Sequence, residues 1–395
     1  MASLERAVAA GVSFALTDEQ KALRELAHEF AEREIRPRAA DYDEHQTHAA
    51  DVIARAHEVG LMNLSLPEEY GGPGCTFFDW ALVIEELNWG CSGMGTALMA
   101  NGLGAGPVLV AGTDEQKRKW LPRLAEEPIL CSFALTEPNA GSDVSGIETT
   151  AKRHGGEYVL NGSKMFITNA SHAEWYTLFA STDRSQGHRG LSAFVVPRET
   201  GGVVVEQHLD KMGQRSTDTA AVALQDVKVP AENRLGEEGQ GFKIAMQTLD
   251  STRPATAIAA VGVARAAFEY ASEYSKSRVQ FGQPIAMNQA VNFLIADMAT
   301  KIEAARLLCW QAAWMLDSGY GRKATLYSSM AKRFAADTCM EVTTDAVQVF
   351  GGYGYIKEYP VEKLMRDAKL YQIYEGTSQI QRLVIAKEIF LPKSD

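Results

Sequence analysis

Phe133-Ala-Leu-Thr-Glu-Pro-Asn-Ala-Gly-Ser-Asp143 is the stretch at which the periodicity of this sequence changes from helical to alternating. It begins as a predicted strand and ends in a loop rich in small and hydroxyl residues. The backbone N–H groups and hydroxyls of such a loop can bind a planar ring or a phosphate. Taken alone, the stretch also fits an ordinary strand-to-turn transition, so the segments around it decide its meaning.

The segment before this stretch is predicted to be α-helical. Thr17-Asp-Glu-Gln20 and Thr113-Asp-Glu-Gln116 both have the spacing of a capping box, and apolar residues follow the first at helical intervals. Helices are also expected over residues 77–88 and 94–111, and another should end near Gly60.

The segment after it is predicted to form a compact β domain followed by long helices. Asn161-Gly162 is a tight-turn signal between two of the expected strands. Short β-prone runs occur at residues 158–160, 165–168, 175–179, 191–196, 203–205 and 221–229. Helical periodicity then covers residues 242–280, 288–317 and 326–350.

This order predicts an α+β fold of three units. Residues 1–128 are expected to form an N-terminal α-helical domain, 129–238 a middle β domain and 239–395 a C-terminal four-helix bundle. A Rossmann fold would instead alternate strand and helix throughout. Gly351-Gly-Tyr-Gly354 is therefore a weak match to a dinucleotide fingerprint, because it follows a helical pattern.

Composition narrows the possible partners and compartments. The net charge is −11 with interleaved signs, which argues against a nucleic-acid or anionic membrane surface. The five cysteines are scattered, so no metal site or redox pair is expected and a reducing compartment fits best. Met1 to Val12 lacks a secretory signal, and no apolar run is expected to span a bilayer. We expect a cytoplasmic protein, or a processed protein of the mitochondrial matrix.

Several blocks, in the same order along nearly the whole chain, resemble the acyl-CoA dehydrogenase family, most closely its medium-chain branch. No block is decisive alone, and the specificity lies in their combination. The blocks are Leu135-Thr-Glu-Pro-Asn-Ala-Gly-Ser-Asp143, Asn161-Gly-Ser-Lys-Met-Phe-Ile-Thr-Asn169, Lys211-Met-Gly-Gln-Arg-Ser-Thr-Asp-Thr219, Arg278-Val-Gln-Phe-Gly282 with Gln289, Asp345-Ala-Val-Gln-Val-Phe-Gly-Gly352 and residues 358–382.

The resemblance implies a homotetramer, or in some members a dimer, with non-covalent FAD between the β domain and the C-terminal bundle. One side of the flavin would be lined by Phe133, Leu135, Thr136, Gly141 and Ser142, and the other by Phe166, Ile167 and Thr168. Residues that would reach the FAD of a neighbouring subunit are Arg278, Gln280, Phe281, Gln289, Gln348, Phe350, Gly351 and Gly352. Thr377 and Gln379 would also contact FAD. Without the family, Arg278 and Gln348 could equally lie on a solvated helix face.

The segment Tyr371-Gln-Ile-Tyr-Glu-Gly-Thr-Ser-Gln-Ile-Gln-Arg382 contains the candidate base, Glu375. Oxidation of a saturated acyl thioester removes a proton from Cα and a hydride from Cβ, so the site needs a base and a hydride acceptor, here flavin N5. A partly desolvated carboxylate has the raised pKa that this proton transfer needs, and apolar neighbours such as Tyr374 supply that environment. In the family, the backbone N–H of this glutamate and the FAD ribityl chain polarise the thioester carbonyl.

Other residues are assigned to substrate by the same resemblance. Asp250 and Arg253 keep the pattern that binds CoA in medium-chain relatives, although a helical Asp-x-x-Arg is more often a simple ion pair. Some branches place the base in the segment Leu249-Asp-Ser-Thr-Arg-Pro254, which contains no glutamate here. The remaining candidate substrate contacts are Ser142, Thr252, Tyr374, Gly376, Gly95 and Met99.

Departures from the family leave the acyl group open. Gly95 and Met99 stand where medium-chain relatives carry larger or charged polar residues, which could lengthen the cavity or could reflect helix packing alone. Phe166 replaces a common tryptophan, and Asn139 replaces a common glycine. Medium, long and branched acyl chains all remain open.

The leading hypothesis is a dehydrogenase that passes electrons to electron-transfer flavoprotein. An oxidase of the same fold is disfavoured because such oxidases tend to carry an extra C-terminal domain. A nitroalkane-oxidising relative would have aspartate in place of Glu375, and a decarboxylating one would need a basic group in the pocket. A silent flavoprotein that serves as a binding module would have lost the base.

Overall fold

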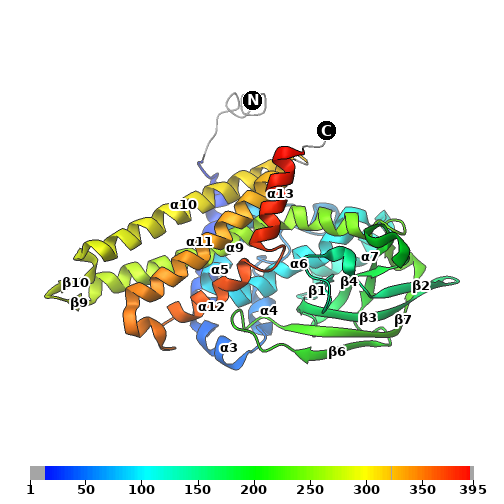
Figure 1. Cartoon of the computed structure of the whole chain (residues 1–395), viewed down its shortest axis with the longest axis horizontal. Coiled ribbons are helices and arrows are strands. Elements are labelled where there is room, and N and C mark those ends of the chain that lie inside the picture. Colours follow the sequence, from blue (N-terminus) through cyan, green and yellow to red (C-terminus); the bar gives the residue numbers. More distant parts are fainter. Residues whose placement is uncertain (1–13, 322, 392–395) are drawn as a thin grey trace.

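The chain folds into helices on both sides of a β domain in sequence, as Figure 1 shows for a computed structural model of the protein. The structure describes residues 14–321 and 323–391, so the expectation for Met1 to Val12 lies outside it. The β domain occupies one end of the molecule, and the long C-terminal helices extend to the other (Figure 1). The predicted α+β class is confirmed.

The N-terminal helices begin where their capping signals predict. Thr17 and Thr113 each accept a hydrogen bond from the backbone N–H of the glutamine three residues later, and both capping boxes are complete. The α-helices of this unit are α2 (Asp18–Phe30), α3 (Ala39–His45), α4 (Ala50–Glu58), α5 (Phe77–Gly90), α6 (Ser92–Ala111), α7 (Asp114–Trp120) and α8 (Pro122–Glu126).

Helix α6 corrects one expectation. Its 20 residues are long and apolar enough to cross a membrane by length and composition, contrary to the prediction that no run is. However, 67% of its most apolar window is buried inside the protein. It packs against α5, α9 and strand β1, so its apolar character is that of a core helix.

The β domain is built on one mainly antiparallel sheet with the strand order β6-β7-β3-β2-β4-β5-β8, and β1 pairs in parallel with β4. Its longer strands match the predicted runs, whereas β2 was not predicted. The strands are β1 (Leu130–Ala134), β2 (Thr150–His154), β3 (Glu157–Thr168), β4 (Ala173–Ser181), β5 (Leu191–Pro197), β6 (Val203–His208), β7 (Thr219–Pro230) and β8 (Arg234–Leu235).

Asn161-Gly162 is not the turn that its sequence predicts. Both residues lie inside β3, which is one continuous strand. The Asn161 side chain instead bonds across to Asp226 of β7, accepting from the Asp226 backbone N–H at 2.9 Å. The pairing register shifts between Leu160 and Gly162, so the dipeptide forms a β-bulge.

The C-terminal unit is a helical bundle in which α9, α10 and α11 pack together and two shorter helices pack on α11. The bounds are α9 (Gly241–Ser277), α10 (Gln289–Asp317), α11 (Lys323–Phe350), α12 (Val361–Tyr371) and α13 (Ser378–Phe390). Between α9 and α10, the short strands β9 (Val279–Gln280) and β10 (Gln283–Pro284) form a hairpin at the far tip of the bundle (Figure 1).

The N-terminal helices and the bundle share one hydrophobic core rather than two. Ile84 and Leu87 of α5 belong to the same buried cluster as Ile258 and Val261 of α9. The helices approach closely at Gly262, where an added Cβ would lie 2.2 Å from the Glu85 carbonyl oxygen. The N-terminal helices, from α2 onward, and the helices of the bundle therefore form a common scaffold.

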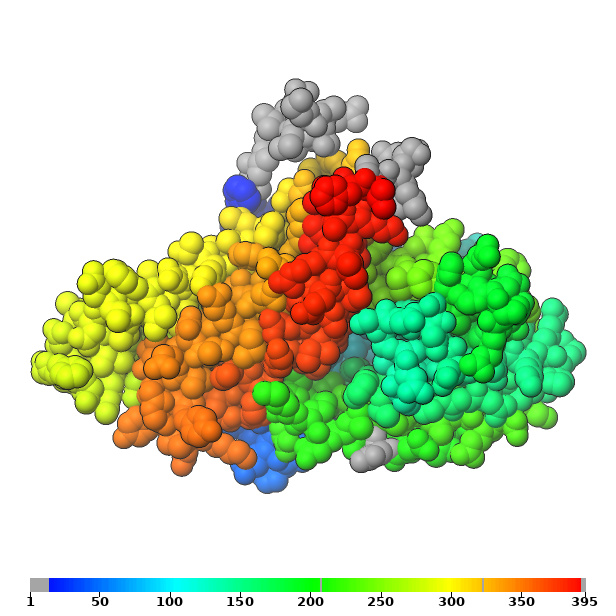
Figure 2. All heavy atoms as spheres, viewed as in Figure 1, coloured from blue at the N-terminus to red at the C-terminus, as the bar shows by residue number. Residues whose placement is uncertain are grey.

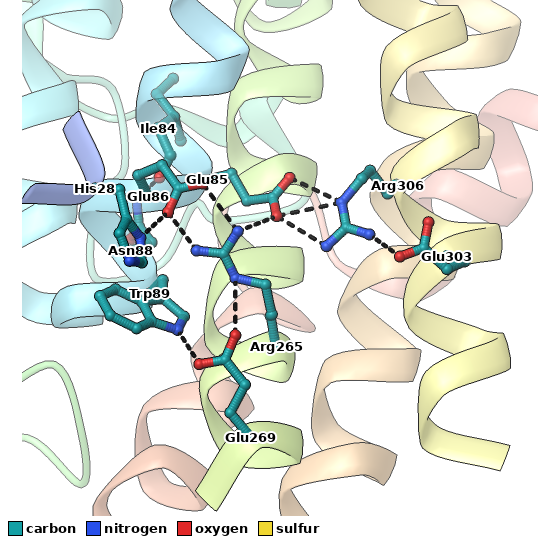
Figure 3. A network of polar contacts seen from close by, with 10 residues as sticks. All are labelled: His28, Ile84, Glu85, Glu86, Asn88, Trp89, Arg265, Glu269, Glu303 and Arg306. Atoms are coloured by element: carbon teal, nitrogen blue, oxygen red, sulfur yellow. Dashed lines mark hydrogen bonds and ion pairs between the residues drawn. The ribbon is translucent and has the colours of Figure 1, made fainter. Parts of the chain in front are cut away.

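A buried network of ion pairs connects the N-terminal helices to the helices of the bundle (Figure 3). Glu85 and Glu86 of α5 face Arg265 of α9 and Arg306 of α10, with Arg265 Nη1 lying 3.0 Å from Glu85 Oε1 and 2.9 Å from Glu86 Oε1. Both glutamate side chains are almost completely buried. His28 of α2 adds a contact of 2.8 Å to Glu86, so the network joins four helices.

Candidate active site

A cavity lies where the loop after β1, the end of β3, helices α6 and α9, and the Tyr374–Gly376 segment meet. Figure 2 shows the C-terminal segment, in red, passing between the helical bundle and the β domain. Predicted site residues that line this one cavity are Phe133, Leu135, Thr136, Gly141, Ser142, Phe166, Ile167, Thr168, Thr252, Arg253, Tyr374, Glu375, Gly376 and Met99. The fold thus brings together residues from positions 99 to 376.

Glu375 occupies a left-handed backbone conformation with φ 50°, and Gly376 follows with φ 87°. This region is unusual for a residue with a side chain, so the surrounding contacts must hold the turn. The Glu375 carboxylate lines the cavity and accepts a hydrogen bond from the Thr252 hydroxyl at 3.2 Å. The turn therefore presents the carboxylate at the cavity wall.

The electrostatic setting of Glu375 favours a proton acceptor. Burial raises the pKa of its carboxyl above the ordinary value, while Thr256, Lys332, Thr252 and Arg253 act in the opposite direction. The group remains open to the cavity but is surrounded by protein atoms. A carboxylate with a raised pKa is a better base than one in water, because its proton affinity is greater.

The loop after β1 is held by a second buried carboxylate, Glu137. Its side chain accepts hydrogen bonds from the backbone N–H groups of Glu148 at 2.6 Å and Thr149 at 3.1 Å. Lys164 of β3 donates to Glu137 at 2.7 Å and to the Leu135 carbonyl at 3.1 Å. Burial alone would raise the pKa of Glu137, but Lys164 and these N–H groups hold it below its usual value.

Phe166 presents an aromatic ring to the cavity. Its side chain is on a residue with φ 62°, where the β3–β7 register shifts between Lys164 and Ile167, and it is 63% exposed. A flat apolar ring, with the hydroxyls of Thr136, Ser142 and Thr168 in the same lining, fits the isoalloxazine of a flavin. These residues could hold FAD.

Asp250 and Arg253 form the ion pair that their spacing allows. Arg253 also lines the cavity and is nearly buried, whereas Asp250 accepts a further hydrogen bond from Thr325 at 3.1 Å. The Arg253 Nε atom is buried and has no hydrogen-bond partner among the residues that the structure describes. An anionic ligand group at the cavity would provide one, so Arg253 can bind such a group while it stays paired with Asp250.

The residues assigned to a neighbouring subunit lie elsewhere. A second hollow, at the base of the β9–β10 hairpin, is lined by Arg278, Gln280, Phe350, Gly351 and Gly352. Phe281 at the hairpin tip is 96% exposed, and Gln289 and Gln348 are also exposed. The hairpin and the β domain lie at opposite ends of the molecule (Figure 1), so these residues do not join the cavity of their own chain.

Besides Asp250 and the residues assigned to a neighbouring subunit, three further predicted residues lie outside the cavity lining. Thr377 caps α13, accepting from the Ile380 N–H at 3.1 Å, and Gln379 is exposed. Gly95 packs against a neighbouring helix, because an added Cβ would lie 2.7 Å from the Asn88 side chain. In the structure, Gly95 thus lies in a close helix contact and outside the lining of this cavity.

Several lining residues escaped the sequence analysis. Trp80 of α5 and the α6 residues Thr96, Ala100 and Leu103 lie on the cavity with Met99. The α6 positions repeat at intervals of three and four, a helical face that could have indicated a shared surface. Trp80 and Thr256 carried no such signal, since each reads as an ordinary helix residue.

Comparisons with known proteins agree with this arrangement. Models of the N-terminal, middle and C-terminal domains of acyl-CoA dehydrogenase match residues 17–128, 132–227 and 239–390. A probable medium-chain specific acyl-CoA dehydrogenase of Caenorhabditis briggsae is 41% identical over 95% of this chain and 91% of its own length. Butyryl-CoA dehydrogenase from Megasphaera elsdenii has a solved structure with a TM-score of 0.93 and 44% identity, covering 96% of this chain and 100% of that one. A chain from work on the electron transferring flavoprotein of Acidaminococcus fermentans has a TM-score of 0.94 and 45% identity, with coverage of 96% and 100%.

Proposed function

The chain belongs to the acyl-CoA dehydrogenase family of FAD-dependent oxidoreductases that act on CH–CH groups, and we propose that Glu375 is its catalytic base. The reaction would convert a saturated acyl-CoA thioester into the trans-2-enoyl-CoA. The observation that carries the proposal is the Glu375 carboxylate, which lines the cavity at 3.2 Å from Thr252 and has a raised pKa. No other Asp or Glu lines that cavity among the residues that the structure describes.

Glu375 would remove the proton from Cα of the thioester. The Cα–H bond is acidified by the adjacent carbonyl, and a hydrogen bond from the Glu375 backbone N–H would stabilise the developing enolate oxygen. The left-handed turn at Glu375 and Gly376 supports the use of both the carboxylate and the backbone N–H of Glu375, because both groups belong to one tightly turned segment at the cavity. When bound, FAD supplies the acceptor for the hydride that leaves Cβ.

FAD would be held by the Phe133–Ser142 loop, by Phe166 to Thr168, and by residues of another copy of the chain. The hollow around Arg278 and Gly351 supports the last point, because its lining combines Arg278, Gln280 and two glycines with aromatic and aliphatic side chains, and it lies far from the cavity of its own chain. We therefore propose a homotetramer in which each hairpin serves a neighbour. The likeness to a chain from work on an electron transferring flavoprotein supports such a protein as the electron acceptor.

Anaerobic mixing with a panel of acyl-CoAs of increasing and branched chain length tests the activity. The flavin absorbance should bleach with at least one member, and no bleaching with any of them would contradict the proposal. Glu375→Gln should keep FAD and bind acyl-CoA, shown by a spectral shift, yet lose reduction by at least about 10²-fold. Reduction at the wild-type rate would assign the base to another residue.

A further inference from the structure

Lys332, on the α11 face toward the Glu375 turn, is a buried cation that the reaction described above does not use. Its side chain is completely buried. Its Nζ donates a hydrogen bond of 2.6 Å to the carbonyl oxygen of Gly376, the residue after the proposed base. A buried ammonium is costly and is retained only where specific contacts compensate for lost water.

A second donor holds the same turn. Gln381 of α13 donates through Nε2 to the Glu375 carbonyl at 3.2 Å and to the Gly376 carbonyl at 3.0 Å. The Gly376 oxygen thus accepts from Lys332 and Gln381 together. Because Glu375 has φ 50°, a conformation that side chains disfavour, these donors fix a turn that would otherwise relax.

Asp337, also on helix α11, forms hydrogen bonds with residues on both sides of the turn. Its Oδ1 accepts from Gln372 Nε2 at 2.8 Å and from the Ser378 hydroxyl at 2.9 Å, on either side of the turn. Arg382 of α13 reaches its Oδ2 at 3.0 Å. Helix α11 therefore contacts the Glu375 segment at its centre with a cation and at both ends with an anion.

The charge at the centre acts on the base as well. Lys332 and Glu375 influence each other electrostatically, and burial lowers the pKa of Lys332 to about 8. Other groups that face this site are Arg253 of α9, which is paired with Asp250, Asp337 of α11, and the Tyr374 hydroxyl from the turn itself. Lys332 is the cation of this set that holds the turn directly.

We propose that Lys332 is a positioning residue for the base. It holds the Gly376 carbonyl so that the Glu375 carboxylate stays at the cavity wall, and its positive charge favours the ionised carboxylate. The inference rests on the proposed role of Glu375. It assigns Lys332 no contact with the reacting atoms.

Three variants separate the two effects on the FAD-loaded, full-length protein. Lys332→Met removes donor and charge, Lys332→Gln keeps a donor without charge, and Gln381→Leu removes the second donor while leaving the charge. The first readout is the limiting rate of flavin reduction as a function of pH. The second is solvent-deuterium exchange at Cα of a 3-thia-acyl-CoA, which reports proton removal without oxidation.

Lys332→Met should lower both the limiting rate and the exchange at neutral pH by about 10²-fold, as expected for a displaced reacting group. Acyl-CoA binding should change less than the rate. The pH midpoint should move upward in both Lys332 variants, because a carboxylate without its nearby cation binds its proton more tightly. Gln381→Leu should lower the rate while leaving the midpoint in place.

Wild-type midpoints in Lys332→Gln would overturn the inference, and this variant decides the question if Lys332→Met does not fold. Glu375→Gln separates the two levels of failure. If it is inactive while the Lys332 variants match the wild type, the positioning role fails and the base stands. If Glu375→Gln itself reduces flavin at the wild-type rate, the proposed function fails.

Discussion

The Lys164 Nζ atom lies 2.7 Å from Oε1 of Glu137, and both side chains are buried. The pair connects strand β3, which ends at the residues proposed to face the flavin, to the loop that contains Gly141 and Ser142. Because Glu137 also binds the Glu148 and Thr149 N–H groups, one carboxylate orders the loop from within. The pair thus links the two walls expected to hold FAD.

Lys164→Met should therefore lower FAD retention. The substitution leaves Glu137 as a buried charge without its cation, a loss that costs about 3 kcal/mol in other proteins. We expect a lower flavin-to-protein ratio after gel filtration, restored in part by added FAD. Lys228→Met, at an exposed position on the same sheet, is the control and should retain flavin fully. Equal retention by both variants would show that the loop is ordered without the pair.

The sequence predicted those features of the fold and of the site that depend on local chemistry. The capping boxes at Thr17 and Thr113 need residues only three positions apart, so their signal is complete within one turn. The Glu375 segment carried its own pattern of aromatic, glycine and hydroxyl residues. These features can be predicted from the local sequence without knowing which distant segments pack against them.

The sequence-based predictions failed, or were missing, where a contact with a distant segment determines the structure. Asn161-Gly162 has a strong local preference for a hairpin, yet pairing with Asp226, 65 residues away, keeps it within a strand. Lys332 reads as an ordinary lysine of a long helix, because its partner at Gly376 is 44 residues away. Gly95 could not be assigned to packing until α5 placed Asn88 against it.

Met99 should limit the length of the acyl chain. It lines the cavity beside Leu103, and Met99→Ala would remove part of that wall. Accommodation of one more methylene in an apolar pocket changes kcat/KM by about 10- to 200-fold. We compare kcat/KM for an acyl-CoA longer than the one that the wild type prefers with kcat/KM for the preferred one. This ratio should be at least about 10-fold higher in Met99→Ala than in the wild type.

Gly95→Ala is the matched control for Met99→Ala on the same helix. An added Cβ would collide with Asn88, so overpacking should destabilise the protein by about 1–3 kcal/mol without moving the chain-length optimum. A shifted optimum in Gly95→Ala would return this residue to the acyl pocket. An unchanged optimum in Met99→Ala would place the limiting wall elsewhere, with Trp80 as the next residue to test.

Glu86→Gln should weaken the scaffold shared by the N-terminal helices and the bundle. Burial alone would raise the Glu86 pKa, but Arg265 and His28 hold it below its usual value. Loss of one partner from a buried ion network costs about 3 kcal/mol. Urea unfolding at neutral pH should show this loss. Lys276→Ala, which breaks an exposed pair on the same helix as Arg265, should stay within about 0.5 kcal/mol of the wild type.

The pH dependence of that difference follows from the depressed pKa of Glu86. Its stabilising contribution is complete above the unfolded pKa of about 4.3 and is lost as the pH falls through the lower folded value. The free energies of unfolding of wild type and Glu86→Gln should therefore converge in acid. A difference that stays constant from neutral pH into acid would show that shape, and not charge, accounts for the effect.

Glu375→Gln should change the free energy of unfolding in the opposite direction from Glu86→Gln, and so stabilise the fold. Burial raises the Glu375 pKa, so the folded state binds this proton more tightly than the unfolded chain, and stability falls as the pH rises from the unfolded pKa through the folded one. At neutral pH the wild type carries this full cost, and glutamine removes it.

The FAD-loaded variant should melt at a higher temperature than the wild type at pH 7.5, and the two melting temperatures should approach one another below the unfolded pKa of about 4.3. Glu341→Gln, at an exposed ion pair, is the control and should show no such pH-dependent gain. A lower melting temperature for Glu375→Gln at pH 7.5 would mean that the contact between Lys332 and the turn depends on the carboxylate, and that the base is stabilised rather than strained where it lies.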